Sequence, residues 1–167
     1  RPPYSRASDM VINPVNPDIL FAAIPDGMRD ASLSGIYRST DAGDTWELVL
    51  TGRMSDVVLN PQNPDIVYTA SSKVFGSGAA DRYGMYKSTD GGDNWFSLDV
   101  GVPDSLMGRT SIGICDAEPD VLYIGVSNVT GDDRTPLLGV FKTVDAGQSW
   151  SKLDVPFDYM VSQGWYD

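Results

Sequence analysis

The chain has 167 residues, of which 23 are acidic and 12 basic; it carries a net charge of −11 and has no histidine. The acidic balance argues against a nucleic-acid partner, because phosphate binding needs a basic surface, and the lack of histidine removes the usual acid–base catalyst near neutral pH. An apolar fraction of 41% is ordinary for a globular protein, which excludes a disordered chain, and no apolar run approaches the roughly 18 residues of a membrane span.

The first predicted elements are two short apolar strands on either side of a turn made of Pro, Asn and Asp. Residues 10–23 read MVINPVNPDILFAA, residues 57–70 read VVLNPQNPDIVYTA, and residues 112–125, IGICDAEPDVLYIG, form a degraded third copy. Proline has no N–H for a central ladder, so each copy predicts strand, turn and strand. The single cysteine, Cys115, lies in the third apolar run and is expected to be a buried thiol.

Two further strands follow each copy. They are predicted at residues 35–38 and 46–49, 84–87 and 95–98, and 139–142 and 150–153. Four strands per repeat without helical periodicity are typical of a β-propeller blade. The sequence therefore predicts an all-β fold, a β-propeller segment of three consecutive four-stranded antiparallel blades with Asp-box hairpins. The predicted blades span residues 9–49, 56–98 and 110–153, and residues 154–167 are the lead-in to a further blade.

Three blades are fewer than a closed ring contains. Propellers typically have about four to eight blades, and an open stack of three would leave apolar faces on its first and last blades in water. We therefore expect the whole of residues 1–167 to be part of one larger propeller domain. The expected partners are the remaining blades of the same propeller, or another chain that completes it.

A second repeat lies between the third and fourth strand of every blade. The pattern Ser/Thr-x-Asp-x-Gly-x-x-Trp occurs at residues 39–46, 88–95 and 143–150, with steps of 49 and 55 residues from Trp to Trp. Glycine tolerates the positive φ of a hairpin turn, an Asp or Ser side chain bonds nearby N–H groups, and Trp buries a large ring beside the turn. The residues assigned this structural role are Ser39, Asp41, Gly43, Trp46, Ser88, Asp90, Gly92, Trp95, Asp145, Gly147 and Trp150.

This pattern resembles the Asp-box, or BNR repeat, of bacterial sialidase-like propellers. Together with Asn-Pro-x-Asn-Pro-Asp it is similar to secreted propellers related to the xyloglucanase-type glycoside hydrolases and to the sortilin ectodomain. The resemblance covers nearly the whole chain. It implies that the boxes are folding elements on the face opposite the ligand site, and that the protein is secreted or displayed on a cell surface, in a bacterium.

The opposite face of such a blade carries the loops between the second and third strands and the loops between blades. These segments differ in length between copies, as expected of binding loops on a rigid scaffold. An arginine precedes each first strand, at Arg6, Arg53 and Arg109. Three converging arginines would bind a carboxylate or a sulfate; the alternative is a structural element that recurs with the repeat.

The remaining candidates on this face are aromatic and acidic. Tyr83, Trp165 and Tyr166 would stack on a sugar ring or anchor a protein partner, although Trp165 and Tyr166 are equally readable as core of a next blade. Asp132 and Asp133 follow a glycine and give a weak signal for Ca²⁺, against solvated loop charge as the alternative. No cofactor and no other metal is expected.

These observations predict a recognition scaffold that binds glycan or protein through the loop face, and they favour binding over catalysis without deciding whether this segment takes part in catalysis. Two alternatives remain open. The chain is a fragment of a glycoside hydrolase, xyloglucanase- or sialidase-like, with its carboxyl pair divided between this segment and other blades; or it is an assembly factor for a protein complex.

Overall fold

The computed structural model describes residues 7–25, 31–71, 83–128 and 137–155. These residues form three four-stranded antiparallel sheets, each with its strands in chain order, which confirms the predicted fold class. The strands are β1 (Asp9–Ile12), β2 (Leu20–Ile24), β3 (Gly35–Ser39) and β4 (Glu47–Thr51) in blade 1; β5 (Met54–Leu59), β6 (Val67–Ser71), β7 (Met85–Ser88) and β8 (Phe96–Leu98) in blade 2; and β9 (Met107–Ile114), β10 (Leu122–Asn128), β11 (Leu137–Thr143) and β12 (Ser151–Lys152) in blade 3.

Little else in the described ranges is regular. Two single-turn 3₁₀ helices, η1 (Ala31–Leu33) and η2 (Asp104–Leu106), lie next to strands β3 and β9. No helix among these residues is long and apolar enough to cross a membrane.

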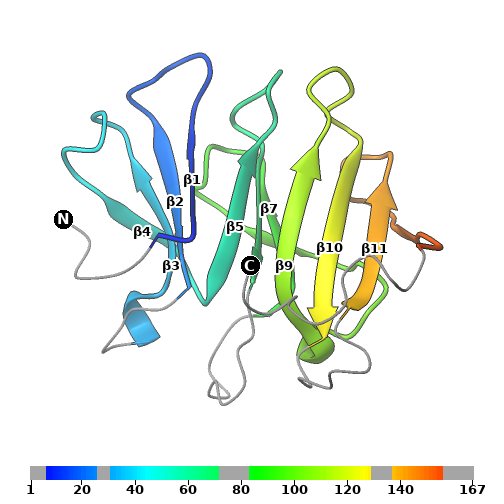
Figure 1. Ribbon diagram of the computed structural model, residues 1–167. Coiled ribbons are helices and arrows are strands. Elements are labelled where there is room, and N and C mark those ends of the chain that lie inside the picture. The colour runs from blue at the N-terminus through cyan, green and yellow to red at the C-terminus, as the bar shows by residue number, and fades with distance from the viewer. Residues whose placement is uncertain (1–6, 26–30, 72–82, 129–136, 156–167) are drawn as a thin grey trace.

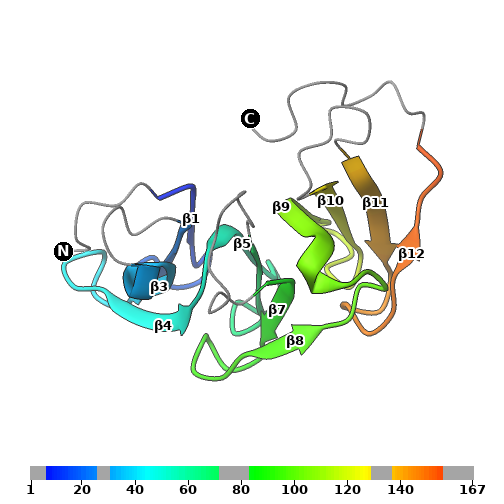
Figure 2. The ribbon, with the colours of Figure 1, turned by 90° about the horizontal axis from the view of Figure 1, so that it is seen from below.

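The three blades stand side by side and fan out around their first strands. Figure 1 shows β1, β5 and β9 in neighbouring positions, and β5 contacts both other first strands. From below, the strands β4, β8 and β12 lie along the outer rim of an arc (Figure 2). The first strand of each blade is therefore the inner strand, as in a propeller.

The apolar core is divided into two clusters, and each lies between two neighbouring blades. The first joins Phe21 and Ile36 of blade 1 to Val57 and Leu59 of blade 2. The second contains Tyr68 and Met85 of blade 2 with Leu122, Ile124 and Phe141 of blade 3. Because each cluster needs residues from two blades, a blade depends on its neighbours for its core.

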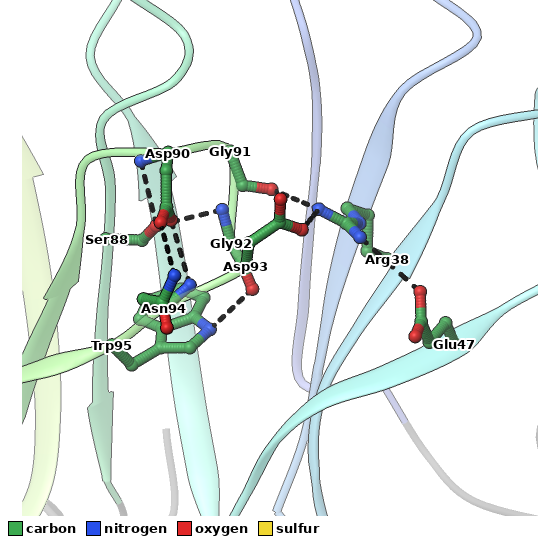
Figure 3. A network of polar contacts seen from close by, with 9 residues as sticks. All are labelled: Arg38, Glu47, Ser88, Asp90, Gly91, Gly92, Asp93, Asn94 and Trp95. Atoms are coloured by element: carbon green, nitrogen blue, oxygen red, sulfur yellow. Dashed lines mark hydrogen bonds and ion pairs between the residues drawn. The ribbon is translucent and has the colours of Figure 1, made fainter.

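The segments 39–46, 88–95 and 143–150, called the Asp turns from here on, are closed from inside by side chains. In the second turn the Ser88 hydroxyl accepts the Gly92 N–H at 2.8 Å, and the Asp90 carboxylate accepts the Asn94 N–H at 2.9 Å (Figure 3). The Trp95 indole donates to the Gly92 carbonyl at 3.0 Å. These bonds satisfy the backbone of the turn without a longer ladder.

The other two Asp turns use the same bonds. Ser39 accepts the Gly43 N–H at 2.9 Å, and Thr143 replaces serine in the third turn and accepts the Gly147 N–H at 3.0 Å. One difference is the indole N–H of Trp150, which is buried and makes no hydrogen bond in the structure.

Every Asp turn is also tied to the Pro-containing turn of its own blade. In each Asp turn, the N–H of the residue that follows the turn's own aspartate donates to a carbonyl of the Pro-containing turn at 2.9 Å. The three bonds are Ala42 to Asp18, Gly91 to Asp65 and Ala146 to Asp120. Both kinds of turn therefore lie at one end of the blades, and strands β2, β6 and β10 end at the other.

Neighbouring blades meet closely at the Asp turns, as a comparison of the space around Gly92 and Gly43 shows. Gly92 and Gly43 have φ angles of +91° and +92°, so alanine is strained equally at both positions. A Cβ on Gly92 would lie 2.9 Å from Cε1 of Phe21 in blade 1, whereas a Cβ on Gly43 would meet nothing nearer than Trp46 at 3.8 Å.

We therefore expect Gly92→Ala to lower the free energy of unfolding by about 1–3 kcal/mol more than Gly43→Ala, because only the first adds overpacking to the shared strain. Urea denaturation of dilute protein, followed by tryptophan fluorescence, measures both values. Equal losses for the two variants would contradict this account of the interface between the blades.

Candidate functional site

The carboxylates of the Asp turns are already engaged by their own turns. Hydrogen bonds from the Asn94 side chain, the Asn94 N–H and Ser88 lower the pKa of Asp90 to about 2, and bonds led by the Ser149 hydroxyl lower that of Asp145 to about 2. The pKa of Asp41 is lowered in the same way, chiefly by Thr45. Carboxylates held ionised to this degree are poor general acids near neutral pH.

A second group of polar side chains lies on the inner strands, toward the end away from the Asp turns. It surrounds a cavity of about 380 Å³, called the inner-strand pocket, which is lined by Ser8, Asp9, Val11, Ser55, Asp56, Val57, Val58, Arg109, Ser111 and Ile112. The pocket thus takes residues from all three blades and combines acidic, basic and hydroxyl groups.

The repeat explains how the polar residues come together. Asp9 and Asp56 occupy the same position in their blades, and each carboxylate accepts a backbone N–H from the next blade: Val57 at 3.0 Å and Ile112 at 2.9 Å. One position earlier, the Ser8 hydroxyl donates to the Ser55 carbonyl at 2.7 Å, and the Ser55 hydroxyl donates to the Thr110 carbonyl at 3.2 Å. These side chains fasten each inner strand to the next.

Among the residues that line this pocket, Asp56 has a raised pKa. Its pKa is raised to about 6, chiefly by burial. The hydrogen bond from the Ile112 N–H lowers this pKa, whereas the negative charge of Asp9 and a side-chain hydrogen bond with Asp9 raise it. Burial and the neighbouring negative charge both favour the protonated form of Asp56. A proton is therefore held inside the pocket at mildly acidic pH.

This pair does not match the known spacing of glycosidase carboxyls. Retaining and inverting enzymes separate the two groups by about 5–5.5 Å and about 6.5–9.5 Å respectively. Asp9 and Asp56 are in hydrogen-bond contact instead. Each also binds a backbone N–H, which gives the pair a structural role.

Of the ligand-binding residues predicted from the sequence, the pocket contains Arg109 on β9. Arg53 precedes β5, is half-buried and does not line this pocket. Tyr83 precedes β7, is also half-buried, and its carbonyl accepts the Tyr86 hydroxyl at 3.1 Å. The other predicted residues, Arg6, Asp132, Asp133, Trp165 and Tyr166, lie outside the described residues.

Asp9 and Asp56 were not among the predicted site residues. The available signal was a Ser-Asp pair at one repeat position, Ser8-Asp9 and Ser55-Asp56, where a polar residue interrupts the start of an apolar strand. The expectation for Cys115 was wrong: it follows the end of β9 and is only partly buried, because it lies at a cavity on the far side of blade 3.

The described residues contain no group of three or more Cys, Asp or Glu side chains that could hold a metal ion. The weak Ca²⁺ hypothesis concerns Asp132 and Asp133, which lie outside these residues, and so it stays a prediction.

Comparison with known proteins shows similarity at the level of structure. No protein-family model matches the chain, and no curated protein sequence matches it. Among solved structures, an ancestral GH74 enzyme superposes with a TM-score of 0.68 at 19% identity, over 92% of this chain and 19% of that one. The GH74 xyloglucanase from Xanthomonas campestris gives a TM-score of 0.63 at 18% identity, over 90% and 24%.

A structure described as YCF48 bound to D1 peptide is also similar, with a TM-score of 0.53 at 18% identity, over 91% of this chain and 40% of that one. Identities this low establish the β-propeller fold and nothing about activity. The chain spans about a fifth of the length of the GH74 enzyme first described, at 19%, so it corresponds to part of such a structure.

The raised pKa of Asp56 predicts how stability depends on pH. Its folded pKa of about 6 exceeds the ordinary value of 3.8, so the folded state binds the proton more tightly and stability falls as pH rises from about 4 to about 6. Asp56→Asn has no such ionisation. We expect the free energy of unfolding of Asp56→Asn, relative to that of the parent, to increase by on the order of 2 kcal/mol between pH 4 and pH 7.5. Urea denaturation at the two pH values measures it.

Asp90→Asn is the matched control, because the pKa of Asp90 is lowered to about 2. The stability that this carboxylate contributes is fully present above its ordinary pKa and is lost only as pH falls toward 2. Asp90→Asn should therefore be less stable than the parent by nearly the same amount at pH 4 and pH 7.5, with only a small decrease of the difference at pH 4. A constant difference for Asp56→Asn over this range would contradict the raised pKa of Asp56.

Proposed function

We propose that the chain is part of a secreted or cell-surface propeller that works as a recognition scaffold, binding glycan or protein at the end of the blades away from the Asp turns. The observation that carries this proposal is the inner-strand pocket, which three blades build at that end of the inner strands. Further blades, or another chain, complete the ring around it.

The chemistry of the pocket supports binding of a polar ligand. Arg109 and Ser111 bring hydrogen-bond donors, and Asp9 and Asp56 bring acceptors, into one hollow beside the apolar Val11. Sugar hydroxyls and peptide amides each need donors and acceptors close together, with some apolar surface beside them. A net charge of −11 makes a polyanionic ligand the least suitable one.

The structural comparisons support both ligand classes. One similar protein is a xyloglucanase, which acts on a polysaccharide, and another is a YCF48 structure with a bound peptide. Each is a longer chain with the same fold, and the choice between glycan and protein therefore rests on binding experiments.

A glycoside hydrolase fragment is the second candidate, favoured by the similarity to GH74 enzymes. Asp56, with its pKa of about 6, is the described carboxyl best suited to hold a proton. Its contact with Asp9 is too short for a glycosidase pair, so a catalytic partner would have to come from elsewhere in the propeller. An assembly factor that binds a peptide segment is the third candidate.

Binding to soluble xyloglucan oligosaccharides and to an overlapping peptide library, measured by calorimetry after array screening, tests the scaffold proposal. We expect binding to one class without release of reducing sugar. Arg109→Ala should weaken it by about tenfold or more, the scale of a lost charge-assisted bond.

Lys152→Ala is the control, since it removes one positive charge from the outer strand β12, where Lys152 is exposed. Its affinity should equal that of the parent. If Arg109→Ala binds with the same affinity as the parent, the binding site lies outside the inner-strand pocket. If the parent releases reducing sugar and Asp56→Asn abolishes this release, the hydrolase alternative is established instead.

A further inference from the structure

Every blade carries an aromatic residue on its second strand directly across from a cation on its third strand. The pairs are Phe21 with Arg38, Tyr68 with Lys87, and Tyr123 with Lys142, and each pair is in register in its sheet. The pairs of blades 1 and 2 lie on the side that faces the following blade. The pair of blade 3 occupies the equivalent register position.

In blades 1 and 2 this pair holds the Asp turn of the following blade. Arg38 Nη1 donates to the Gly91 carbonyl at 2.7 Å and to Asp93 at 2.6 Å (Figure 3). Lys87 Nζ donates to the Ala146 carbonyl at 2.9 Å, and the Tyr68 hydroxyl donates to the same oxygen at 3.2 Å. Gly91 and Ala146 occupy the same position in their turns.

The equivalent pair of blade 3 has the same geometry around an open cavity. Lys142 Nζ lies 5.4 Å from the centre of the Tyr123 ring, as Lys87 Nζ lies 5.2 Å from that of Tyr68. Tyr123 is 41% exposed, whereas Phe21 and Tyr68 are at most 1% exposed. The cavity, of about 590 Å³, is called the blade 3 socket and is lined by Cys115, Glu118, Pro119, Asp120, Val121, Tyr123, Lys142 and Val144.

Blade 1 presents the complementary surface at the other end of the chain. Met10 and Ile12 are 55% and 56% exposed, while the residues at the same positions in blade 2, Val57 and Leu59, are 0% and 8% exposed against blade 1. Gly92 and Gly147 are buried under the preceding blade, whereas Gly43, at the same position of the first Asp turn, is only half-buried. Ala42 beside it is exposed, while its counterparts Gly91 and Ala146 are half-buried. Met10, Ile12 and the turn 39–46 are called the blade 1 front face.

The type of socket also matches the type of turn. The Tyr/Lys pair of blade 2 holds the sequence Asp-Ala-Gly, with Ala146 at a φ of 56°, whereas the Phe/Arg pair of blade 1 holds Asp-Gly-Gly. The open socket is of the Tyr/Lys type. The open turn is Asp41-Ala42-Gly43, with Ala42 at a φ of 55°.

We propose that the blade 3 socket binds the first Asp turn of a second copy of this chain. Lys142 and the Tyr123 hydroxyl then donate to the Ala42 carbonyl of that copy, and the socket side of blade 3 covers its Met10 and Ile12. The contact is head to tail, and the three blades of the described residues supply six blades when two copies combine. This number is within the range of about four to eight in closed propellers.

This inference deepens the proposal that another chain completes the ring, and it leaves the ligand open. Association is therefore measured without any ligand, by sedimentation velocity over a range of protein concentrations. We expect the parent to dimerise. Ile12→Lys, in the front face, and Lys142→Glu, in the socket, should each weaken dimerisation by about tenfold or more, because each places a charge where apolar contact or a carbonyl is expected.

Phe96→Lys is the matched control for Ile12→Lys. It replaces an exposed apolar strand residue, 61% exposed, on the outer strand β8, away from both end surfaces. Phe96→Lys should dimerise like the parent. Lys142→Ala, which removes the donor without adding a charge, repeats the socket test if Lys142→Glu unfolds by circular dichroism.

Mixing the two defective variants distinguishes head-to-tail docking from any symmetric contact. Ile12→Lys retains an intact socket and Lys142→Glu retains an intact front face, so an equimolar mixture should form a dimer that neither forms alone. Alkylation of the single cysteine, Cys115, should slow in parallel, since Cys115 lines the socket.

The proposal is overturned if the parent stays monomeric at all concentrations, or if the mixture does not restore the dimer. The blade 3 socket would then bind a blade that does not belong to a second copy of this chain. Neither result bears on ligand binding at the inner-strand pocket, which is measured separately. Dimerisation that Phe96→Lys weakens as much as Ile12→Lys would also overturn it.

Discussion

The structure depends on how the Asp turn divides its hydrogen bonds. Side chains inside the turn, such as Ser88 and Asp90, satisfy its N–H groups, and one further N–H goes to the Pro-containing turn of the same blade. The carbonyl of the middle residue is left pointing outward, where the cation of the preceding blade binds it: Arg38 at Gly91 and Lys87 at Ala146. Because a buried carbonyl needs a partner, this one bond sets where neighbouring blades meet.

The inner strands are also joined by hydrogen bonds from side chains of one blade to the backbone of the next. Asp9 and Asp56 reach across to a backbone N–H of the next inner strand, and Ser8 and Ser55 reach across to a carbonyl. The carboxylates in the exposed turns and on the inner strands all accept N–H bonds, yet their pKa values move apart, to about 2 for Asp90 and about 6 for Asp56. Burial decides the difference, because desolvation at the inner strands outweighs the bond.

These contacts explain how far the sequence could predict the structure. The strands and Asp turns follow from local rules, since Gly, Asp and Pro act within a few residues of their position. Because the same pattern occurs three times in the sequence, each copy supports the prediction made for the others. The roles of Asp9 and Asp56 could not be predicted, because their partners lie 48 and 56 residues away along the chain. The pairing of Tyr123 with Lys142 likewise depends on strand register, which turn geometry sets together with the apolar pattern. The burial of Cys115 depends on whether a neighbouring blade covers it.

The outer surfaces of the first and last blades differ from those of a free-standing array of repeats. Arrays of repeats that stand alone need terminal repeats with a polar outer surface. In the described residues the first blade instead exposes Met10 and Ile12, and the last blade exposes Tyr123 beside an unfilled cavity. These surfaces are the same ones that blades 1, 2 and 3 bury between themselves, so their exposure is a cost in hydrophobic free energy that a further blade removes. The repeat thereby favours closure into a ring, in which each Asp turn meets an aromatic–cation pair, over an open stack of three blades.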